Sequence, residues 1–193
     1  MRKALQVITN TAPESDREVL ARCRAGQTEA FEVLLRRHQH RLFSVALRMM
    51  KDRDLAAELV QEALYRAYKN LPSYSATGSV KGWLTRITVN VCLNEIRKRQ
   101  RLVFSERSLE NWLESDRSSD PAHRAQASEL GQKVKKEVGK LTPLRQALLA
   151  MAALAYSYDE MAEVCGQSVS QVKSELFRAR KKLRESLKEY RRE

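Results

Sequence analysis

Polar and basic side chains with helical spacing lie near the C-terminal end of the sequence, from Ser170 to Lys181. Polar side chains on the first turns of a helix can reach base edges in the major groove, while later Arg and Lys side chains suit phosphates. The residues expected to make such contacts are Ser170, Gln171, Lys173, Ser174, Phe177, Arg178 and Lys181. The alternative is a solvated basic face on an ordinary helical hairpin.

Two capped helices would position this face. Ser157 and Glu160 form a capping-box pattern, and Ser168 with Gln171 repeats it directly after the Gly166 turn. Two helices joined by a short glycine-containing turn are the sequence form of a helix-turn-helix. The buried stripe of the second helix is expected to contain Val172, Leu176, Ala179 and Leu183. Together with the charge described next, this arrangement favours DNA binding over the solvated face.

The overall charge also points to a polyanion. The 193 residues include 36 Lys and Arg against 24 Asp and Glu, which gives a net charge of +12. Each basic side chain set against a phosphate releases condensed counterions and so favours binding. Two basic blocks flank residues 102–128, where acidic residues are in excess. This distribution predicts two binding modules on a connector.

The N-terminal block reads as a helical bundle. Ser15 and Glu18 form a capping box that predicts a helix ending near Gly26, and an apolar stripe from Phe31 to Met49 predicts a second. Further helices are expected at about 54–71 and 80–101, separated by a polar loop after Pro72. His38 is expected at the edge of the core. In the C-terminal block, Thr142-Pro143 is expected to supply a cap and a first-turn proline. No segment alternates like a strand, so the predicted class is all-α.

Several kinds of site are not indicated. Cys23, Cys92 and Cys165 lie far apart and show no metal-ligand spacing with the three histidines, so we expect no metal and no cofactor. No nucleophile motif or glycine-rich phosphate loop occurs, and we expect no catalytic residues and no enzyme activity. No signal peptide and no apolar run of membrane-spanning length occurs, so we expect a cytoplasmic protein without membrane insertion.

Five segments resemble the extracytoplasmic-function (ECF) RNA polymerase sigma factors. Residues 54–68, DLAAELVQEALYRAY, and residues 82–90, GWLTRITVN, are similar to that family's second region. Residues 141–146, 157–162 and 172–180 are similar to its fourth region. The resemblance implies two small helical domains joined by a flexible linker. Its expected parts are an N-terminal arm (1–14), a region-two domain (15–101), the linker (102–128) and a region-four helix-turn-helix domain (129–193).

The resemblance also implies partners and residue roles. Glu58, Gln61 and Glu62 match positions that dock on the coiled-coil clamp of the polymerase β′ subunit. The −35 element would be read by the helix described above, and members of the family are often held inactive by an anti-sigma factor. The implied partners are core RNA polymerase (β′ clamp coiled coil and β subunit), promoter DNA and an anti-sigma factor. The residues implied at the −10 element, where the loop before the fourth helix would capture a flipped base, are Tyr74, Ser75, Thr77, Lys81, Arg86, Asn90, Asn94 and Arg97.

Two departures from the family pattern concern the −35 element. The family usually has an Arg-Glu pair late in the helix before the turn, often with a glycine soon after, where this chain has Met151-Ala-Ala-Leu-Ala155. Glu175 stands where a basic residue is common. A carboxylate there would repel phosphate, although it could accept a hydrogen bond from a cytosine amino group.

Two alternatives to a sigma factor remain open at this point. One is a helix-turn-helix regulator that binds operators without acting as a polymerase subunit. The other is a small nuclease, which the acidic residues support poorly because they form no convincing metal-binding cluster. Binding to core polymerase separates the first alternative from a sigma factor.

Overall fold

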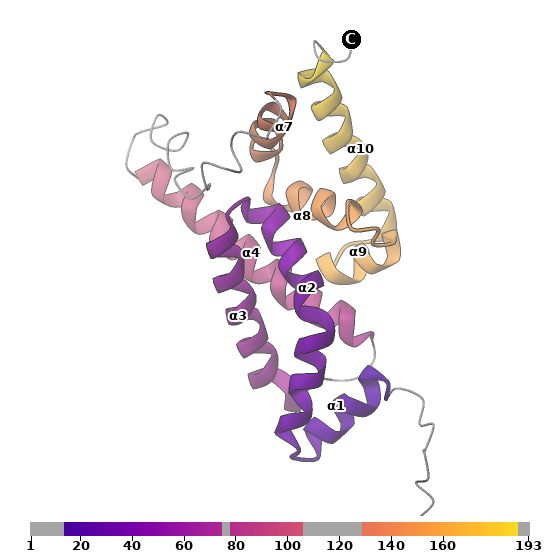
Figure 1. Cartoon of the computed structure of the whole chain (residues 1–193). Coiled ribbons are helices and arrows are strands. Elements are labelled where there is room, and N and C mark those ends of the chain that lie inside the picture. The colour runs from indigo at the N-terminus through magenta and orange to yellow at the C-terminus, as the bar shows by residue number, and fades with distance from the viewer. Residues whose placement is uncertain (1–13, 75–77, 106–128, 189–193) are drawn as a thin grey trace, which may run out of the picture.

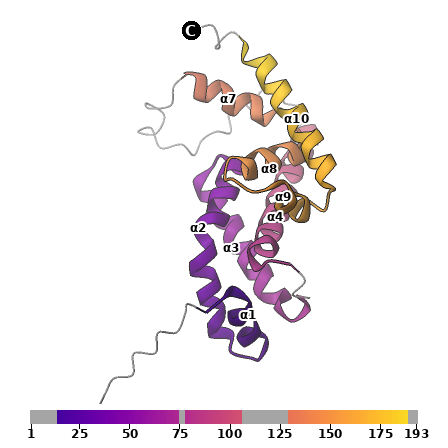
Figure 2. The same cartoon turned by 90° about the vertical axis from the view of Figure 1, so that its right-hand side faces the viewer.

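The computed structural model describes residues 14–74, 78–105 and 129–188, and within these residues every regular element is a helix. Figures 1 and 2 show the arrangement from two directions. Two 3₁₀ turns, η1 (Thr28–Ala30) and η2 (Leu71–Ser73), precede α2 and follow α3. The α-helices are α1 (Asp16–Arg24), α2 (Phe31–Met50), α3 (Arg53–Asn70), α4 (Val80–Ser105), α7 (Glu129–Gly139), α8 (Pro143–Ala152), α9 (Tyr158–Cys165) and α10 (Val169–Ser186). The prediction of an all-α fold is confirmed.

Helix starts follow the capping signals of the sequence. At α1 the Ser15 hydroxyl accepts a hydrogen bond from the Glu18 backbone N–H at 3.3 Å, and the Glu18 carboxylate accepts from the Ser15 backbone N–H at 2.7 Å. The same reciprocal box opens α9 and α10. Each box satisfies donors that the first turn of a helix leaves unpaired. Local sequence therefore fixes where these three helices begin.

One predicted cap is wrong. Pro143 lies in the first turn of α8 as expected, but the Thr142 side chain makes no cap hydrogen bond. The turn before α8 is held instead by the buried side chain of Gln146, whose amide donates to the Gly139 carbonyl at 3.2 Å and to the Leu141 carbonyl at 2.8 Å. The Gln146 side chain is long enough to reach these carbonyls from its position within α8. The spacing of residues in the sequence did not predict this contact.

Three helices form the N-terminal bundle. Helices α2, α3 and α4 pack side by side, and α1 lies at the end of the bundle away from the C-terminal helices (Figure 1). Leu34 and Val45 of α2 and Leu84 of α4 are essentially inaccessible to solvent. Fully burying side chains of this size stabilises a fold by roughly 1.5–3 kcal/mol each. Because Ala63 and Ala67 on the buried face of α3 are small, this helix can approach its neighbours closely.

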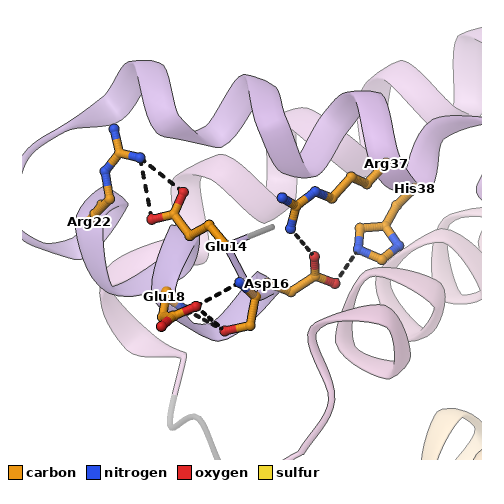
Figure 3. Close-up of polar contacts among 7 residues, drawn as sticks. Glu14, Asp16, Glu18, Arg22, Arg37 and His38 are labelled. Carbon is orange, nitrogen blue, oxygen red and sulfur yellow. Dashed lines mark hydrogen bonds and ion pairs between the residues drawn. The ribbon is translucent and has the colours of Figure 1, made fainter. Parts of the chain in front are cut away.

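A polar cluster attaches α1 to α2 (Figure 3). The Asp16 carboxylate accepts a hydrogen bond from Arg37 Nη1 at 2.9 Å and contacts His38 Nε2 at 2.6 Å. Burial disfavours the charged form of Asp16, but the hydrogen bonds with Arg37 and His38 outweigh it and lower the pKa of this carboxyl below its ordinary 3.8. The His38 side chain is 12% exposed and has a polar partner, as expected for a histidine at the core edge.

Helices α8, α9 and α10 form the C-terminal block, with α7 beside α10 (Figure 2). Apolar side chains from the three helices meet in its centre. The large buried side chains among these include Leu148, Met151, Met161, Val164, Val172 and Leu176. The turn between α8 and α9 contains Ala155 at a φ of 57°, in the left-handed region. A side chain with a Cβ is strained there by roughly 1–2 kcal/mol, which fits the glycine that the family often has near this point.

The two blocks pack against each other, an arrangement that the sequence did not predict. Helices α8 and α9 lie against α2 and α4, and the hydrophobic core continues from one block into the other. At the contact, Arg41 Nη2 donates to the Leu154 carbonyl at 3.1 Å, and the hydroxyl groups of Tyr156 and Thr85 are 3.0 Å apart. The α9 side chain of Glu163 lies so close to α4 that a Cβ on Gly82 would be 3.3 Å from its carboxylate oxygens.

Candidate nucleic-acid interface

A helix-turn-helix is built by α9 and α10. Helix α9 ends at Gly166, which adopts the left-handed conformation with a φ of 64°, and Ser168 caps α10 two residues later. Glycine accepts this backbone geometry without a Cβ clash, so the chain can reverse direction within a short turn. Val172 and Leu176 bury one side of α10 against α8 and α9. The opposite side of α10 faces solvent.

All seven α10 residues predicted to contact DNA lie on this open side. They are Ser170, Gln171, Lys173, Ser174, Phe177, Arg178 and Lys181, and each is exposed. Phe177 is 65% exposed, which is unusual for a large apolar side chain. Apolar side chains in the major groove contact the thymine methyl group. The Lys173 ammonium lies 5.5 Å from the ring centroid of Tyr158, so the start of α9 and the start of α10 share one surface.

Glu175 is held by two arginines. Its Oε2 accepts a hydrogen bond from Arg145 Nε at 2.7 Å, and its Oε1 accepts from Arg178 Nη1 at 2.7 Å. The hydrogen bond with Arg145, followed by that with Arg178, lowers the pKa of the Glu175 carboxyl, so it is ionised at neutral pH. Both carboxylate oxygens are thus engaged in this structure. Sequence reasoning missed Arg145, because its partner lies 30 residues away along the chain.

A groove of about 650 Å³ runs between α3 and α4. Glu58, Gln61 and Glu62, predicted to bind core polymerase, line its α3 side, while Asn94 and Lys98 line its α4 side. Glu62 accepts a hydrogen bond from Arg66 at 2.6 Å, and all three predicted residues are exposed. The structure therefore gathers the predicted docking residues on one accessible surface and places one predicted −10 residue at its edge.

Four of the predicted −10 residues of α4 form one exposed stripe. Arg86, Asn90, Asn94 and Arg97 follow each other at intervals of three or four residues, which keeps them on one face of a helix. Arg97 Nη1 donates to Asn94 Oδ1 at 3.3 Å. Amide and guanidinium groups in a row can contact both bases and phosphates of a nucleic acid strand. This face is accessible in the described structure.

The other predicted −10 residues are placed differently. Tyr74 is buried, its hydroxyl donates to the Gly78 carbonyl at 2.9 Å, and its ring packs on Trp83 with 4.6 Å between centroids. Lys81 forms an ion pair with Glu160 of α9. Neither side chain is free to contact DNA in this arrangement. Ser75 and Thr77 lie outside the described residues.

Metal and thiol chemistry are not indicated in the parts of the chain that the structure describes. No group of three His, Cys, Asp or Glu side chains there could hold a metal ion. The three cysteines are free, and burial raises the pKa of the Cys92 thiol to about 12. A thiol with such a pKa stays protonated and is a poor nucleophile. None of the described helices is long and apolar enough to cross a membrane.

Known proteins resemble both blocks. Residues 34–102 match sigma-70 region 2, and residues 132–183 match sigma-70 region 4. The RNA polymerase sigma-H factor of Pseudomonas aeruginosa is 28% identical over 182 residues, which cover 90% of this chain and 94% of that protein. The ECF RNA polymerase sigma-E factor of Escherichia coli K12 is 29% identical over 174 residues, which cover 86% and 91% of the two chains.

Two solved structures resemble the whole arrangement of helices. The sigma factor RpoE from Bartonella quintana, in complex with the anti-sigma factor NepR, has a TM-score of 0.62 and 29% sequence identity. The matched part covers 82% of this chain and 96% of that one. CnrH in complex with the cytosolic domain of CnrY has a TM-score of 0.65 and 23% sequence identity, and the matched part covers 91% of this chain and 98% of that one. At this identity the similarity shows the fold alone.

A helical bundle carrying one sigma region, followed by a helix-turn-helix carrying another, defines a transcription initiation factor of the sigma-70 class. The chain belongs to the ECF sigma factors. The resemblance stated from the sequence is confirmed, while the roles of individual residues stay predictions.

Proposed function

We propose that this chain binds core RNA polymerase as a subunit, directs it to specific promoters and helps to open the −10 element. One observation carries the proposal. A single chain contains both matched sigma regions, and each presents an exposed face of the required chemistry: the groove between α3 and α4, and the open side of α10. A protein that only binds operator DNA needs the open side of α10 but not the groove between α3 and α4.

At the −10 element, the stripe on α4 is proposed to hold the DNA strand. In this proposal Arg86 and Arg97 neutralise phosphates, and Asn90 and Asn94 between them hydrogen-bond base edges. Melting takes bases out of the stack, and an unstacked base needs a pocket to hold it. The loop between α3 and α4 is proposed to supply that pocket. Tyr74, now packed on Trp83, would have to swing outward for a stacking role.

At the polymerase, Glu58, Gln61 and Glu62 are proposed to dock on the coiled-coil clamp of β′, with further contacts to the β subunit. Two carboxylates and an amide on exposed turns of α3 supply hydrogen-bond acceptors for a basic partner surface. The proposed unit for this docking and for the −10 element is residues 15–101, and the unit for the −35 element is residues 129–193. Residues 102–128 are proposed to connect them along the polymerase.

The closed packing of the two blocks is proposed to open when the chain reaches a promoter. The −10 and −35 elements are about 25 base pairs apart, which is roughly 85 Å of duplex. A compact chain of this length has a radius of gyration of roughly 16 Å, so one closed molecule cannot span both elements. Lys81, predicted at the −10 element, is moreover held by Glu160 of the opposite block. Separation of α8 and α9 from α2 and α4 would free Lys81 and would let the two DNA-binding faces reach both elements.

The proposal also covers catalysis, location and inhibition. The chain itself supplies no catalytic group, because the polymerase forms the phosphodiester bonds. It acts in the cytoplasm, where polymerase and chromosome are. An anti-sigma factor holds it inactive, a role supported by the two solved structures of similar fold, in which RpoE is bound by NepR and CnrH by the cytosolic domain of CnrY.

Co-elution with core polymerase tests the proposal against the operator-binding alternative. The full chain is mixed with bacterial core RNA polymerase that lacks any sigma factor, and the mixture is separated by size at moderate salt. We expect the chain to travel with the polymerase in the absence of DNA. A chain that binds duplex DNA but stays separate from the polymerase would be an operator-binding regulator.

A further inference from the structure

An ion pair between α8 and α10 includes one of the two departures from the family pattern. The usual arginine late in α8 is absent, because the segment there is Met151–Ala155, and Glu175 occupies a position that is often basic. The structure joins Glu175 to Arg145, two turns before the end of α8. A guanidinium of α8 therefore lies beside α10, although it comes from an earlier turn than the family's usual arginine.

The Arg145–Glu175 contact is built into the junction of α8 and α10. The two side chains are only 23% and 22% exposed, whereas Arg178, the second partner of Glu175, is 62% exposed. The three groups form a row in which one carboxylate lies between two guanidinium groups. Because the row carries one net positive charge, the carboxylate does not make this surface repulsive to DNA.

Holding the carboxylate also orients the arginines. Arginine has five N–H donors in a rigid planar group, and Arg145 uses its Nε–H for Glu175. A guanidinium fixed at one edge presents its remaining donors in a defined direction, which suits the oxygen atoms of a phosphate. Arg178 is fixed in the same way through one Nη. A free arginine would lose more conformational entropy on binding DNA than these two.

We propose that Arg145 is a phosphate-contacting residue of the −35 interface, and that Glu175 is a positioning residue that holds Arg145 and Arg178 toward the DNA. The proposal rests on the sigma-factor function above. It adds a residue on α8 to the DNA surface and gives Glu175 a role other than accepting a hydrogen bond from cytosine or repelling phosphate.

The experiment uses holoenzyme made from the full chain and core polymerase. Affinity is measured over a salt series for a promoter selected by the wild-type holoenzyme, and for the same fragment with its −35 segment scrambled. We expect Arg145→Gln to lower affinity about tenfold on both fragments and to reduce the salt slope by about one. Arg145→Lys should recover part of the loss. The control Lys140→Gln removes a positive charge that pairs with Glu137 in the same block, and it should change affinity less than about twofold.

Glu175→Gln separates the three possible roles of this carboxylate. If Glu175 positions the arginines, its neutralisation lowers affinity although a negative charge is lost, and Arg145→Gln then costs less in this background. A rise in affinity on both fragments would overturn the proposal in favour of simple repulsion. A loss confined to one base pair, with Arg145→Gln costing the same in both backgrounds, would overturn it in favour of direct base reading. Thermal unfolding of each variant shows whether it is folded at the assay temperature.

Failure of the proposed function gives a different result. A wild-type chain that binds no core polymerase or selects no promoter would overturn that function, and this inference with it. If the wild type selects a promoter and the Arg145→Gln holoenzyme binds it equally tightly with an unchanged salt slope, the function stands and only the inference on Arg145 is overturned.

Discussion

The guanidinium of Arg41 lies over the ring of Tyr156, with 4.3 Å between its central carbon and the ring centroid. Arg41 comes from α2 and Tyr156 from the turn between α8 and α9, so this contact joins the two sigma regions directly. Tyr156 is 5% exposed and also meets the hydroxyl of Thr85. Arg41 Nε is buried and has no hydrogen-bond partner in the part of the chain that the structure describes. A cation stacked on an aromatic ring away from water contributes about 2 kcal/mol.

Loss of this stack should open the molecule. We expect Tyr156→Leu to increase the radius of gyration of the full chain in small-angle X-ray scattering, because the contact between the two blocks loses the ring on which Arg41 stacks. Tyr156→Phe keeps the ring and removes only the hydroxyl, so it should have a smaller effect. An unchanged scattering profile for Tyr156→Leu would show that the blocks are held together by other contacts.

The docking surface on α3 can be tested by removing two of its side chains. The double variant Gln61→Ala and Glu62→Ala should weaken binding to core polymerase, while helicity measured by circular dichroism stays normal. Glu62 also pairs with Arg66 four residues later, so a matched control is needed. Glu32→Ala removes the equivalent surface pair with Arg36 on α2. Unchanged core affinity of the double variant would contradict the assignment.

Lys173 and Lys181 should play different parts at the −35 element. Lys173 lies near the start of α10, where a side chain can enter the groove, and Lys181 lies about two turns later. Lys173→Ala should cost about 1–3 kcal/mol on the preferred sequence and relax discrimination there. Lys181→Ala should weaken binding nearly uniformly and lower the salt slope by about one. The measurement is the affinity of each variant holoenzyme for the preferred and the scrambled fragment. Equal losses of affinity on both fragments for Lys173→Ala would show that Lys173 contacts only the DNA backbone.

The attachment of α1 should depend on pH through Asp16. Its pKa is lowered in the folded chain, so the ionised carboxylate stabilises the fold above its ordinary pKa of 3.8, and this contribution is lost as the pH falls through the folded value. Asp16→Asn should therefore reduce the free energy of unfolding by roughly 1 kcal/mol at neutral pH. The difference from wild type should shrink in urea titrations below about pH 4. A difference that is the same at neutral and acidic pH would mean that Asp16 acts without its charge.

Local signals predicted much of this structure, and long-range contacts account for what they missed. The capping boxes at Ser15, Ser157 and Ser168 and the apolar stripes gave the helices, because both depend on residues within one or two turns. The stack of Arg41 on Tyr156 could not be predicted from the sequence. The two residues are 115 positions apart, and arginine and tyrosine are ordinary residue types in either block.

The candidate site was likewise predicted only in part. Exposure of the α10 face followed from the helical period, and so did the α4 stripe. The burial of Tyr74 against Trp83 did not, because a tyrosine in a polar loop carries no signal of the ring that it will meet. Arg145 was missed for a similar reason. Its partner Glu175 appeared in the sequence only as an unexpected charge on the recognition helix.

Transcription by core polymerase is the most direct test of the central claim. Core RNA polymerase is supplied with the full chain and a linear template library whose upstream region is random, and the templates that yield run-off transcripts are sequenced. We predict that the chain makes transcripts start at defined positions downstream of two enriched segments, one near −10 and one near −35, and that core polymerase alone enriches neither. Transcripts whose starts and upstream sequences are the same with and without the chain would contradict the account.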